Sequence, residues 1–100
     1  MGRRALRKID PGLDLSNHWR DVSQLPDDWQ LDQLFSRSAP LEVEVGSGKG
    51  LFLERVTAER SENNFVGIEI SRKYCRFTAA RLARRQRSNV IMLHGDAFTI

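Results

Sequence analysis

The sequence of 100 residues is 40% hydrophobic and 29% charged, which is typical of a soluble globular protein of at most one small domain. Its single cysteine excludes an internal disulfide and a cysteine-based metal site, and no apolar run is long enough for a signal peptide or a membrane span. We therefore expect a cytoplasmic protein without a metal, and the net charge of +3 weakly favours an anionic partner.

The first 40 residues are predicted to form an arm and a short segment that precede the main domain. Residues 1–14 are rich in basic side chains and contain the helix breaker Asp10-Pro11-Gly12, a pattern typical of a flexible arm. The basic residues of this arm, which we consider as RNA contacts, are Arg3, Arg4, Arg7 and Lys8. From charge alone, a solvated tail without a role is an equally good interpretation.

The segment between this arm and residue 41 supplies apolar side chains without a regular period. Asp27 or Asp28 is suited to cap a short helix that runs through Phe35. The tryptophans at positions 19 and 29 suggest either stacking on RNA bases or packing of the segment against the domain. We favour packing, because large aromatic side chains contribute most through the apolar area that they bury.

The strongest pattern in the chain is the string Leu-Glu-Val-Glu-Val-Gly-Ser-Gly-Lys-Gly-Leu at residues 41–51. Apolar and charged residues alternate over 41–45, which predicts a strand, and apolar residues at helical spacing predict a helix over 50–60. The three glycines in between allow the backbone to approach a ligand closely. A strand, a glycine loop and a helix in this order are typical of the start of a nucleotide-binding α/β domain.

The spacing of Gly46, Gly48 and Gly50 indicates which type of nucleotide-binding loop this is. It departs from the dinucleotide fingerprint, whose third glycine comes one position later, and from the Walker A loop, which needs Ser or Thr after its lysine. An acidic residue followed by three alternate glycines resembles motif I of the class I S-adenosylmethionine (SAM) methyltransferases, with Glu44 in the acidic position. The resemblance implies SAM as the cofactor, and its cationic groups favour a nearby carboxylate.

Two more strands and one more helix are predicted. Residues 65–70 form an apolar run typical of a buried parallel strand, Ser71 is placed to cap a helix that extends to about residue 87, and residues 90–94 predict a third strand. The order β-α-β-α-β with short connections predicts a parallel sheet with right-handed crossovers. We therefore expect an α/β protein, a partial Rossmann-like class I methyltransferase fold in which residues 41–100 form the SAM-binding half.

Three carboxylates come at or just after the ends of the predicted strands, namely Glu44, Glu69 and Asp96. Because ligands bind outside the carboxyl ends of strands in an open α/β sheet, we expect them to converge on one pocket beside the glycine loop. Glu69 has the spacing of an acidic residue that holds ribose hydroxyls, and Asp96 would accept from an adenine amino group. The predicted cofactor-binding residues are Glu44, Gly46, Ser47, Gly48, Gly50, Glu69, Asp96 and Ala97.

The second helix is strongly basic. Its residues Lys73, Arg76, Arg84 and Arg87 fall on one stripe opposite the apolar face that contains Cys75, and we consider the four basic residues as RNA contacts. For any single arginine, a solvated helix face is the better interpretation, whereas the density of the cluster favours an anionic partner. Cys75 and His94, the last residue of the third strand, are predicted to be structural rather than catalytic.

Several strings together resemble the bacterial tRNA (guanine-N7-)-methyltransferases. They are Gly46-Ser-Gly-Lys-Gly50, Asn64-Phe-Val-Gly-Ile-Glu-Ile70, Lys73-Tyr74, Asn89-Val90 and Gly95-Asp-Ala97. The resemblance implies tRNA as the partner and methyl transfer from SAM to N7 of a guanine, with SAM contacts at Glu44, Glu69 and Asp96. In that family the catalytic aspartate lies in a later Phe-Pro-Asp-Pro-Trp string, so the catalytic residues are expected beyond Ile100.

The last residue of the sequence leads to two further expectations. In the methyltransferase sheet, the strand at 41–45 lies between the strands present here and the later ones, so one of its edges lacks a partner. Because unpaired edges promote association, we expect self-association through this edge and no activity on tRNA from the 100-residue chain alone. Two alternatives remain open: a SAM-dependent methyltransferase with a protein or small-molecule acceptor, and a non-catalytic module that binds SAM or RNA.

Overall fold

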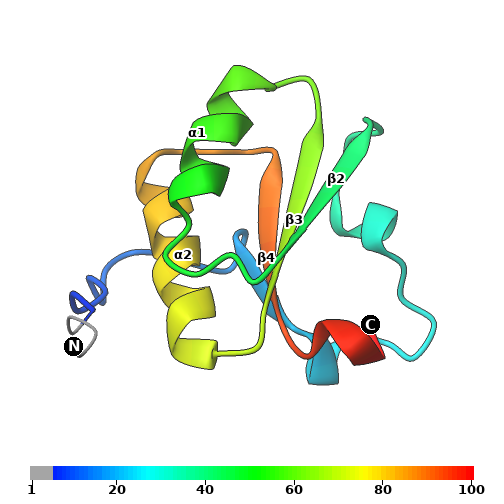
Figure 1. Cartoon of the computed structure of the whole chain (residues 1–100), viewed down its shortest axis with the longest axis horizontal. Coiled ribbons are helices and arrows are strands. Elements are labelled where there is room, and N and C mark those ends of the chain that lie inside the picture. Colours follow the sequence, from blue (N-terminus) through cyan, green and yellow to red (C-terminus); the bar gives the residue numbers. More distant parts are fainter. Residues whose placement is uncertain (1–5) are drawn as a thin grey trace.

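The computed structural model describes residues 6–100, which form one parallel β-sheet with two α-helices on one face (Figure 1). The strands are β1 (Trp19–Asp21), β2 (Leu41–Val45), β3 (Asn64–Glu69) and β4 (Val90–His94). The α-helices are α1 (Leu51–Glu59) and α2 (Arg72–Arg84), and three short 3-10 helices are η1 (Val22–Gln24), η2 (Leu31–Leu34) and η3 (Ala97–Thr99). Arg3 and Arg4, predicted as RNA contacts, lie outside the described residues.

The strand order is β1-β4-β3-β2, and every neighbouring pair is parallel. The predicted β-α-β-α-β order from residue 41 onward is therefore confirmed, with α1 and α2 as the crossovers. The register pairs Glu44 with Gly67, and Glu69 with His94. The carboxyl ends of β2, β3 and β4 consequently meet at the same edge of the sheet.

The face of the sheet under α1 and α2 holds the larger hydrophobic core. Phe65 and Met92 of the sheet pack there against Leu53 of α1 and Leu82 of α2. Cys75 belongs to the same cluster and is fully buried, and this burial raises the pKa of its thiol to about 12. The structural role predicted for Cys75 is thus confirmed, because a buried protonated thiol is a poor nucleophile.

The opposite face is covered by the segment between β1 and β2, which Figure 1 shows in cyan beside the sheet. Val66, Ile68 and Leu93 are buried there, and Trp29 packs against them. Trp19 packs instead on the core under the helices. The predicted packing of both tryptophans onto the domain is therefore confirmed.

In the region before residue 41, one element was not predicted and one prediction is wrong. The sequence pattern missed β1, a three-residue strand that pairs with β4 and extends the sheet. The helix expected from Asp27 or Asp28 through Phe35 is only the four-residue η2, which starts after Gln30. The segment instead alternates turns and extended residues, which allows its scattered apolar side chains to reach the sheet.

Helix α2 begins as predicted and ends earlier than predicted. The Ser71 side chain accepts a hydrogen bond from the Tyr74 amide and caps the helix. At the other end, Gln86 has a φ of 56°, the Gln86 amide donates to the Ala83 carbonyl, and the Arg87 amide donates to the Leu82 carbonyl. This left-handed turn with paired bonds is a Schellman motif, and it turns Arg87 back toward α1.

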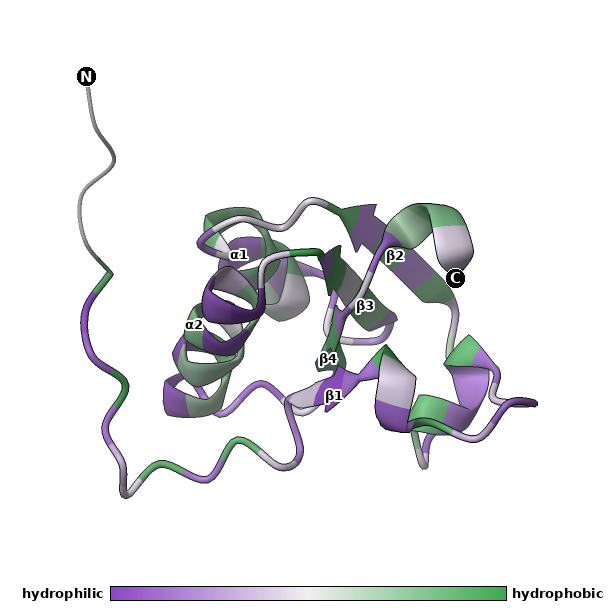
Figure 2. Cartoon of the chain, turned by 90° about the horizontal axis from the view of Figure 1, so that it is seen from below, coloured by the Kyte–Doolittle hydropathy of each residue, from purple (hydrophilic) through white to green (hydrophobic). Residues whose placement is uncertain are grey.

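Strand β2 lies at an edge of the sheet and presents apolar side chains to solvent. Val43 and Val45 are exposed on the face opposite α1 and α2, with Val45 retaining 63% of its accessible surface. Figure 2 shows β2 at the margin of the sheet, away from β1. Among the described helices, none is long and apolar enough to span a membrane.

Candidate functional site

The glycine loop joins β2 to α1 at the carboxyl edge of the sheet. Gly46, Gly48 and Gly50 have φ values of 74°, 57° and 81°, in the left-handed region that side chains disfavour. The Gly46 amide donates to the Ile68 carbonyl at 2.8 Å, which continues the ladder between β2 and β3 into the loop. The sequence string therefore folds into a tight turn that only glycines adopt without strain.

Two close approaches hold this loop against the rest of the domain. A Cβ atom on Gly50 would lie 2.4 Å from Thr78 Cγ2, so α2 packs directly on the loop backbone. A Cβ atom on Gly67 would lie 2.5 Å from Ser47 Oγ and 2.8 Å from Leu53 Cδ1, so β3 makes room for the loop. Ser47, a predicted cofactor residue, is itself buried at this contact.

Side chains of α2 fix the remaining backbone of the loop. The Thr78 hydroxyl donates to the Gly48 carbonyl at 2.7 Å, and Arg81 Nε donates to the Lys49 carbonyl at 2.9 Å. These bonds satisfy the carbonyls of Gly48 and Lys49 and attach the loop to α2. The roles of Thr78 and Arg81 in the site were not predicted from the sequence, because contacts across 30 or more residues leave no local signal.

Glu69, the last residue of β3, connects the loop with the start of α2. Its Oε1 accepts from the Gly48 amide at 3.1 Å, and its Oε2 accepts from the Ser71 amide at 2.9 Å. Glu69 is buried, with 9% of the residue's surface accessible to solvent. A carboxylate has about four acceptor positions, so each oxygen retains the capacity to accept another donor.

A cavity of about 650 Å³ opens beside the loop and Glu69. Its walls are formed by Gly46, Gly48, Lys49, Glu69, Ile70, Ser71 and Tyr74. This volume lies in the range of cavities that hold a small-molecule cofactor. Three residues of this lining were not among the predicted cofactor residues: Ile70, Ser71 and Tyr74. Their position just after a strand that ends in an acidic residue could have indicated a place beside the cofactor.

Glu44 lies within β2, two residues before Gly46 of the glycine loop. A Cβ at Gly67, the residue paired with Glu44 in β3, would point toward Leu53 of α1. Because paired residues of neighbouring strands share a face, the Glu44 side chain is also on the helix-covered face. Burial raises the pKa of Glu44, and the Ser47 side chain acts in the opposite direction. Glu44 is not among the cavity-lining residues.

Asp96 and Ala97 follow β4 at the same edge of the sheet, where Asp96 is the N-cap of η3 and Ala97 is the first residue of that helix. Asp96 Oδ1 accepts from the Phe98 amide at 2.9 Å and caps this short helix, while Ala97 packs against the core on the face opposite α1 and α2. Neither residue lines the cavity beside Glu69. The three carboxylates therefore share one edge of the sheet, and only Glu69 lines the cavity.

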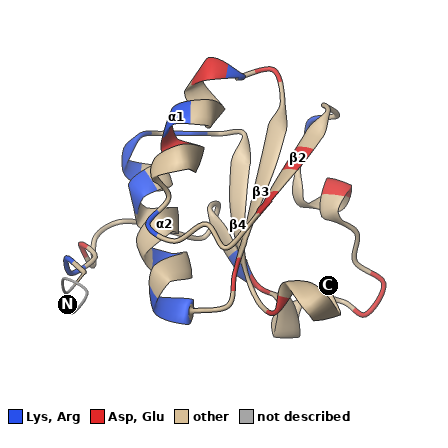
Figure 3. Cartoon of the chain, viewed as in Figure 1, with Lys and Arg blue, Asp and Glu red and all other residues tan. Residues whose placement is uncertain are grey.

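The basic residues of α2, and Arg87 just after its end, lie in different environments. Lys73 and Arg76 line a second cavity with Arg7 and Lys8, and the guanidinium of Arg76 lies 5.8 Å from the centre of the Trp19 ring. Figure 3 shows the basic residues along α2. Arg84 is exposed, whereas Arg87 is partly buried.

Arg87 makes several structural hydrogen bonds. Its Nη2 donates to the Glu54 carbonyl at 2.9 Å, and its Nε donates to the Thr57 hydroxyl at 3.1 Å. These bonds join the end of α2 to α1. Phosphate binding by Arg87 would have to compete with them.

His94 is structural, as predicted. Its Nδ1 lies 3.3 Å from Asp21 Oδ2, and its Nε2 lies 3.2 Å from the Ile70 carbonyl, so it ties β1 and the end of β3 to β4. Hydrogen bonds from Ser23 and from His94 lower the pKa of Asp21. Within residues 6–100, no group of three or more His, Cys, Asp or Glu side chains is arranged to hold a metal ion.

Comparisons with known proteins place the chain among methyltransferases. The profile of a family described as "Putative methyltransferase" matches residues 38–100. The tRNA (guanine-N(7)-)-methyltransferase of Rhodopirellula baltica is 50% identical over 97 residues, covering 97% of this chain and 36% of the relative. The enzymes of the same name from Oceanobacillus iheyensis and Lactiplantibacillus plantarum are each 34% identical, over 68% and 76% of this chain and 32% and 35% of their own lengths. The chain thus spans about a third of the length of these relatives.

Proposed function

The chain belongs to this methyltransferase family, and from that premise we propose that it is the SAM-binding part of a tRNA (guanine-N7-)-methyltransferase. In this proposal, residues 41–100 form the cofactor-binding unit, and residues 1–40 form the arm and segment before it. The observation that carries the proposal is the Glu69 carboxylate, buried at the cavity and bonded to the glycine loop. The cytoplasm is the proposed location, because tRNA is the proposed substrate.

The residues around the cavity fit SAM in three respects. Glu69 retains acceptor positions for two hydroxyl protons of a ribose diol, since each of its oxygens holds only one backbone donor. The loop backbone is open to close approach, since Gly46 and Gly48 have no atom within 4 Å of the position that a Cβ would take. Ile70 and Tyr74 add apolar surface for an adenine ring.

Further cofactor contacts are proposed for residues around this cavity. Glu44 supplies a negative charge toward the cationic end of the ligand, and its partial burial strengthens that attraction. Gly46, Ser47, Gly48 and Gly50 supply the backbone surface. Asp96 and Ala97 lie at the same sheet edge, and their proposed contact with adenine requires η3 to move toward the cavity.

Methyl transfer from SAM to N7 of guanine needs no strong acid or base among these residues. A bound SAM would supply a methyl group to N7 of guanine, whose lone pair would form the new C–N bond as the C–S bond of the sulfonium breaks, leaving neutral S-adenosylhomocysteine and a positively charged base. The contribution of this chain is therefore to bind and orient, which lowers the entropic part of the barrier. Accordingly, we assign it no catalytic acid or base.

The proposed partner is tRNA. The basic residues considered for it are Arg3, Arg4, Arg7, Lys8, Lys73, Arg76, Arg84 and Arg87. Four of the described members, Arg7, Lys8, Lys73 and Arg76, line one common cavity between the arm and α2, where they outnumber the two lining carboxylates of Asp10 and Asp14. This convergence of positive charge from two segments supports a polyanionic partner.

Calorimetric titration of the purified chain tests the cofactor. SAM should bind in a one-to-one ratio, and NAD, which has a pyrophosphate that this loop is not spaced to hold, should not. Binding of NAD in preference to SAM would overturn the cofactor assignment. In parallel, tight binding of a protein extract with no binding of unmodified tRNA would favour another acceptor class.

A further inference from the structure

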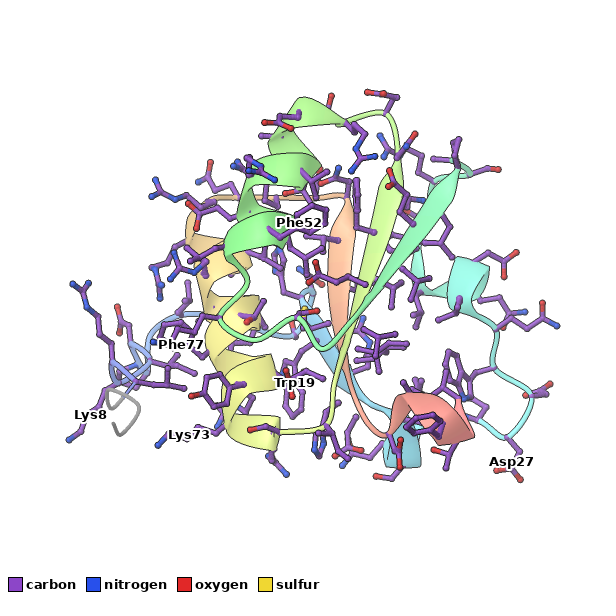
Figure 4. The ribbon with its side chains drawn as sticks, in the orientation of Figure 1. Lys8, Trp19, Asp27, Phe52, Lys73 and Phe77 are labelled. Atoms are coloured by element: carbon purple, nitrogen blue, oxygen red, sulfur yellow. The ribbon has the colours of Figure 1, made fainter. Side chains whose placement is uncertain are left out.

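A basic cleft lies between the N-terminal arm and the second half of α2, on the far side of the glycine loop from the cofactor cavity. It encloses about 550 Å³, and its lining includes five cationic side chains and one aromatic one: Arg7, Lys49, Arg81, Arg84, Arg85 and Phe77. Leu6 of the arm completes the lining. In Figure 4, Phe77 projects from α2 on the side of the N-terminal segment, consistent with this arrangement.

The positive charge of this basic cleft is only partly neutralised. Glu54 pairs with Arg81 at 2.8 Å and with Arg85 at 3.1 Å, so one carboxylate serves two guanidinium groups. Within residues 6–100, Arg7, Lys49 and Arg84 form no ion pair. Five cations that face one another with a single carboxylate repel unless an anion binds between them.

Two details of the basic cleft favour phosphate groups over bases. Phe77 is buried, with its ring under the Arg81 guanidinium at 5.6 Å, so its face is not available to stack on a base. Glu54 orients Arg81 and Arg85, and each guanidinium has further N–H donors that can bind a phosphate. Contacts of this kind fix the position of a nucleic acid without reading its sequence.

We propose that the basic cleft binds backbone phosphates of the substrate tRNA and so positions the RNA beside the cofactor. Lys49 lines both the basic cleft and the cofactor cavity, which makes the two sites neighbours across the loop. The proposal rests on the proposed function for the choice of tRNA. It adds Lys49, Arg81 and Arg85 to the contacts expected from sequence, and it places Arg7 and Arg84 together.

The test compares two double variants that each remove two positive charges. Arg7→Gln with Arg84→Gln alters the basic cleft, leaves both Glu54 ion pairs intact and changes no residue that lines the cofactor cavity. Arg55→Gln with Arg60→Gln is the matched control, since both arginines are exposed and neither lines the basic cleft. Affinity for an unmodified tRNA transcript is measured by fluorescence anisotropy over a range of salt concentrations.

The cleft variant should lose about two phosphate contacts. Its slope of log affinity against log salt should fall by about 1.4 to 1.8, and its affinity by roughly tenfold or more at about 0.1 M salt, while the control keeps the wild-type slope. Equal salt slopes for wild type and cleft variant, or equal losses of tRNA affinity in both double variants, would overturn the proposal that the basic cleft binds phosphates. SAM affinity measured on the same samples separates the two proposals: tRNA binding without SAM binding overturns the proposed function alone, and SAM binding without tRNA binding overturns the basic cleft.

Discussion

The Glu69 carboxylate and the Gly48 amide are joined by a hydrogen bond of 3.1 Å, between residues 21 positions apart in the sequence. This bond connects the end of β3 to the centre of the glycine loop. The same carboxylate also accepts from the Ser71 amide at the start of α2. Glu69 therefore orders the backbone around the cavity before any ligand binds, which lowers the entropic cost of binding.

Glu69→Gln should weaken SAM binding while the fold is retained. An amide of the same shape retains one acceptor oxygen, so it loses the charge and one of the two backbone bonds. We expect calorimetry to show a loss of roughly 1.5–3 kcal/mol in SAM binding. Glu62→Gln, in the exposed turn after α1, is the control and should bind SAM as the wild type does. Unchanged affinity in Glu69→Gln would remove Glu69 from the cofactor site.

Gly50→Ala should destabilise the protein through a single steric contact. The new Cβ would meet Thr78 Cγ2 at 2.4 Å, and alanine also resists the φ of 81° at this position. We expect a loss of roughly 2–4 kcal/mol in the free energy of unfolding, measured by urea denaturation.

Thr78→Ser serves as the matched second change for Gly50→Ala. It removes Cγ2 and keeps the hydroxyl that donates to the Gly48 carbonyl. Added to Gly50→Ala, it should recover part of the loss and leave about 1–2 kcal/mol from the backbone strain. Additive effects of the two substitutions would show that the contact with Thr78 is not what excludes a side chain at position 50.

The core of this fold was predictable from the sequence because its signals are local. The alternation in β2, the apolar runs of β3 and β4, and the Ser71 cap each lie within a few residues of the element that they specify. The glycine spacing likewise indicated a loop between β2 and α1, whereas its left-handed φ values became visible only in the structure. What the sequence did not reveal depends on distant partners: β1 has only three residues and exists because β4 offers an edge.

The site shows the same division between local and distant signals. Glu69 was predictable because its position at a strand end after a glycine loop is a pattern along the chain. The roles of Thr78 and Arg81 depend on how α2 packs on the loop, and spacing along the sequence does not encode that packing. The direction taken by Arg87 depends on the left-handed residue Gln86, which a helix period does not predict.

Glu54 should contribute stability that disappears in acid. Hydrogen bonds and charge from Arg81, with a further contribution from Arg85, lower the pKa of Glu54 below its ordinary value of 4.5. A carboxylate with a lowered pKa in the folded state stabilises the protein above its unfolded pKa, and this stability is lost as the pH falls through the folded pKa. Glu54→Gln should therefore cost roughly 1 kcal/mol at neutral pH and nothing once the carboxylate is protonated.

Urea denaturation of wild type and Glu54→Gln at neutral pH and over a series of pH values falling below 4.5 tests this dependence. The matched control is Glu59→Gln, which breaks a 3.8 Å pair with Arg55 on the exposed side of α1. That pair should contribute less than about 0.5 kcal/mol at each of these pH values. A Glu54→Gln effect that is independent of pH would show that packing, rather than charge, explains the role of Glu54.

The exposed edge at β2 leads to the last prediction. Val43 and Val45 present apolar surface beside backbone groups of an edge strand, and such edges pair with other chains unless charged residues interrupt them. We propose that the chain self-associates through this edge, so its average mass in sedimentation should rise with concentration. Val45→Lys should suppress the association, because the lysine places a charge at the contact. Leu51→Lys, an equally exposed apolar position on α1, adds the same charge away from the edge and should leave the association intact. Equal suppression by both variants would mean that net charge, rather than the β2 edge, governs association.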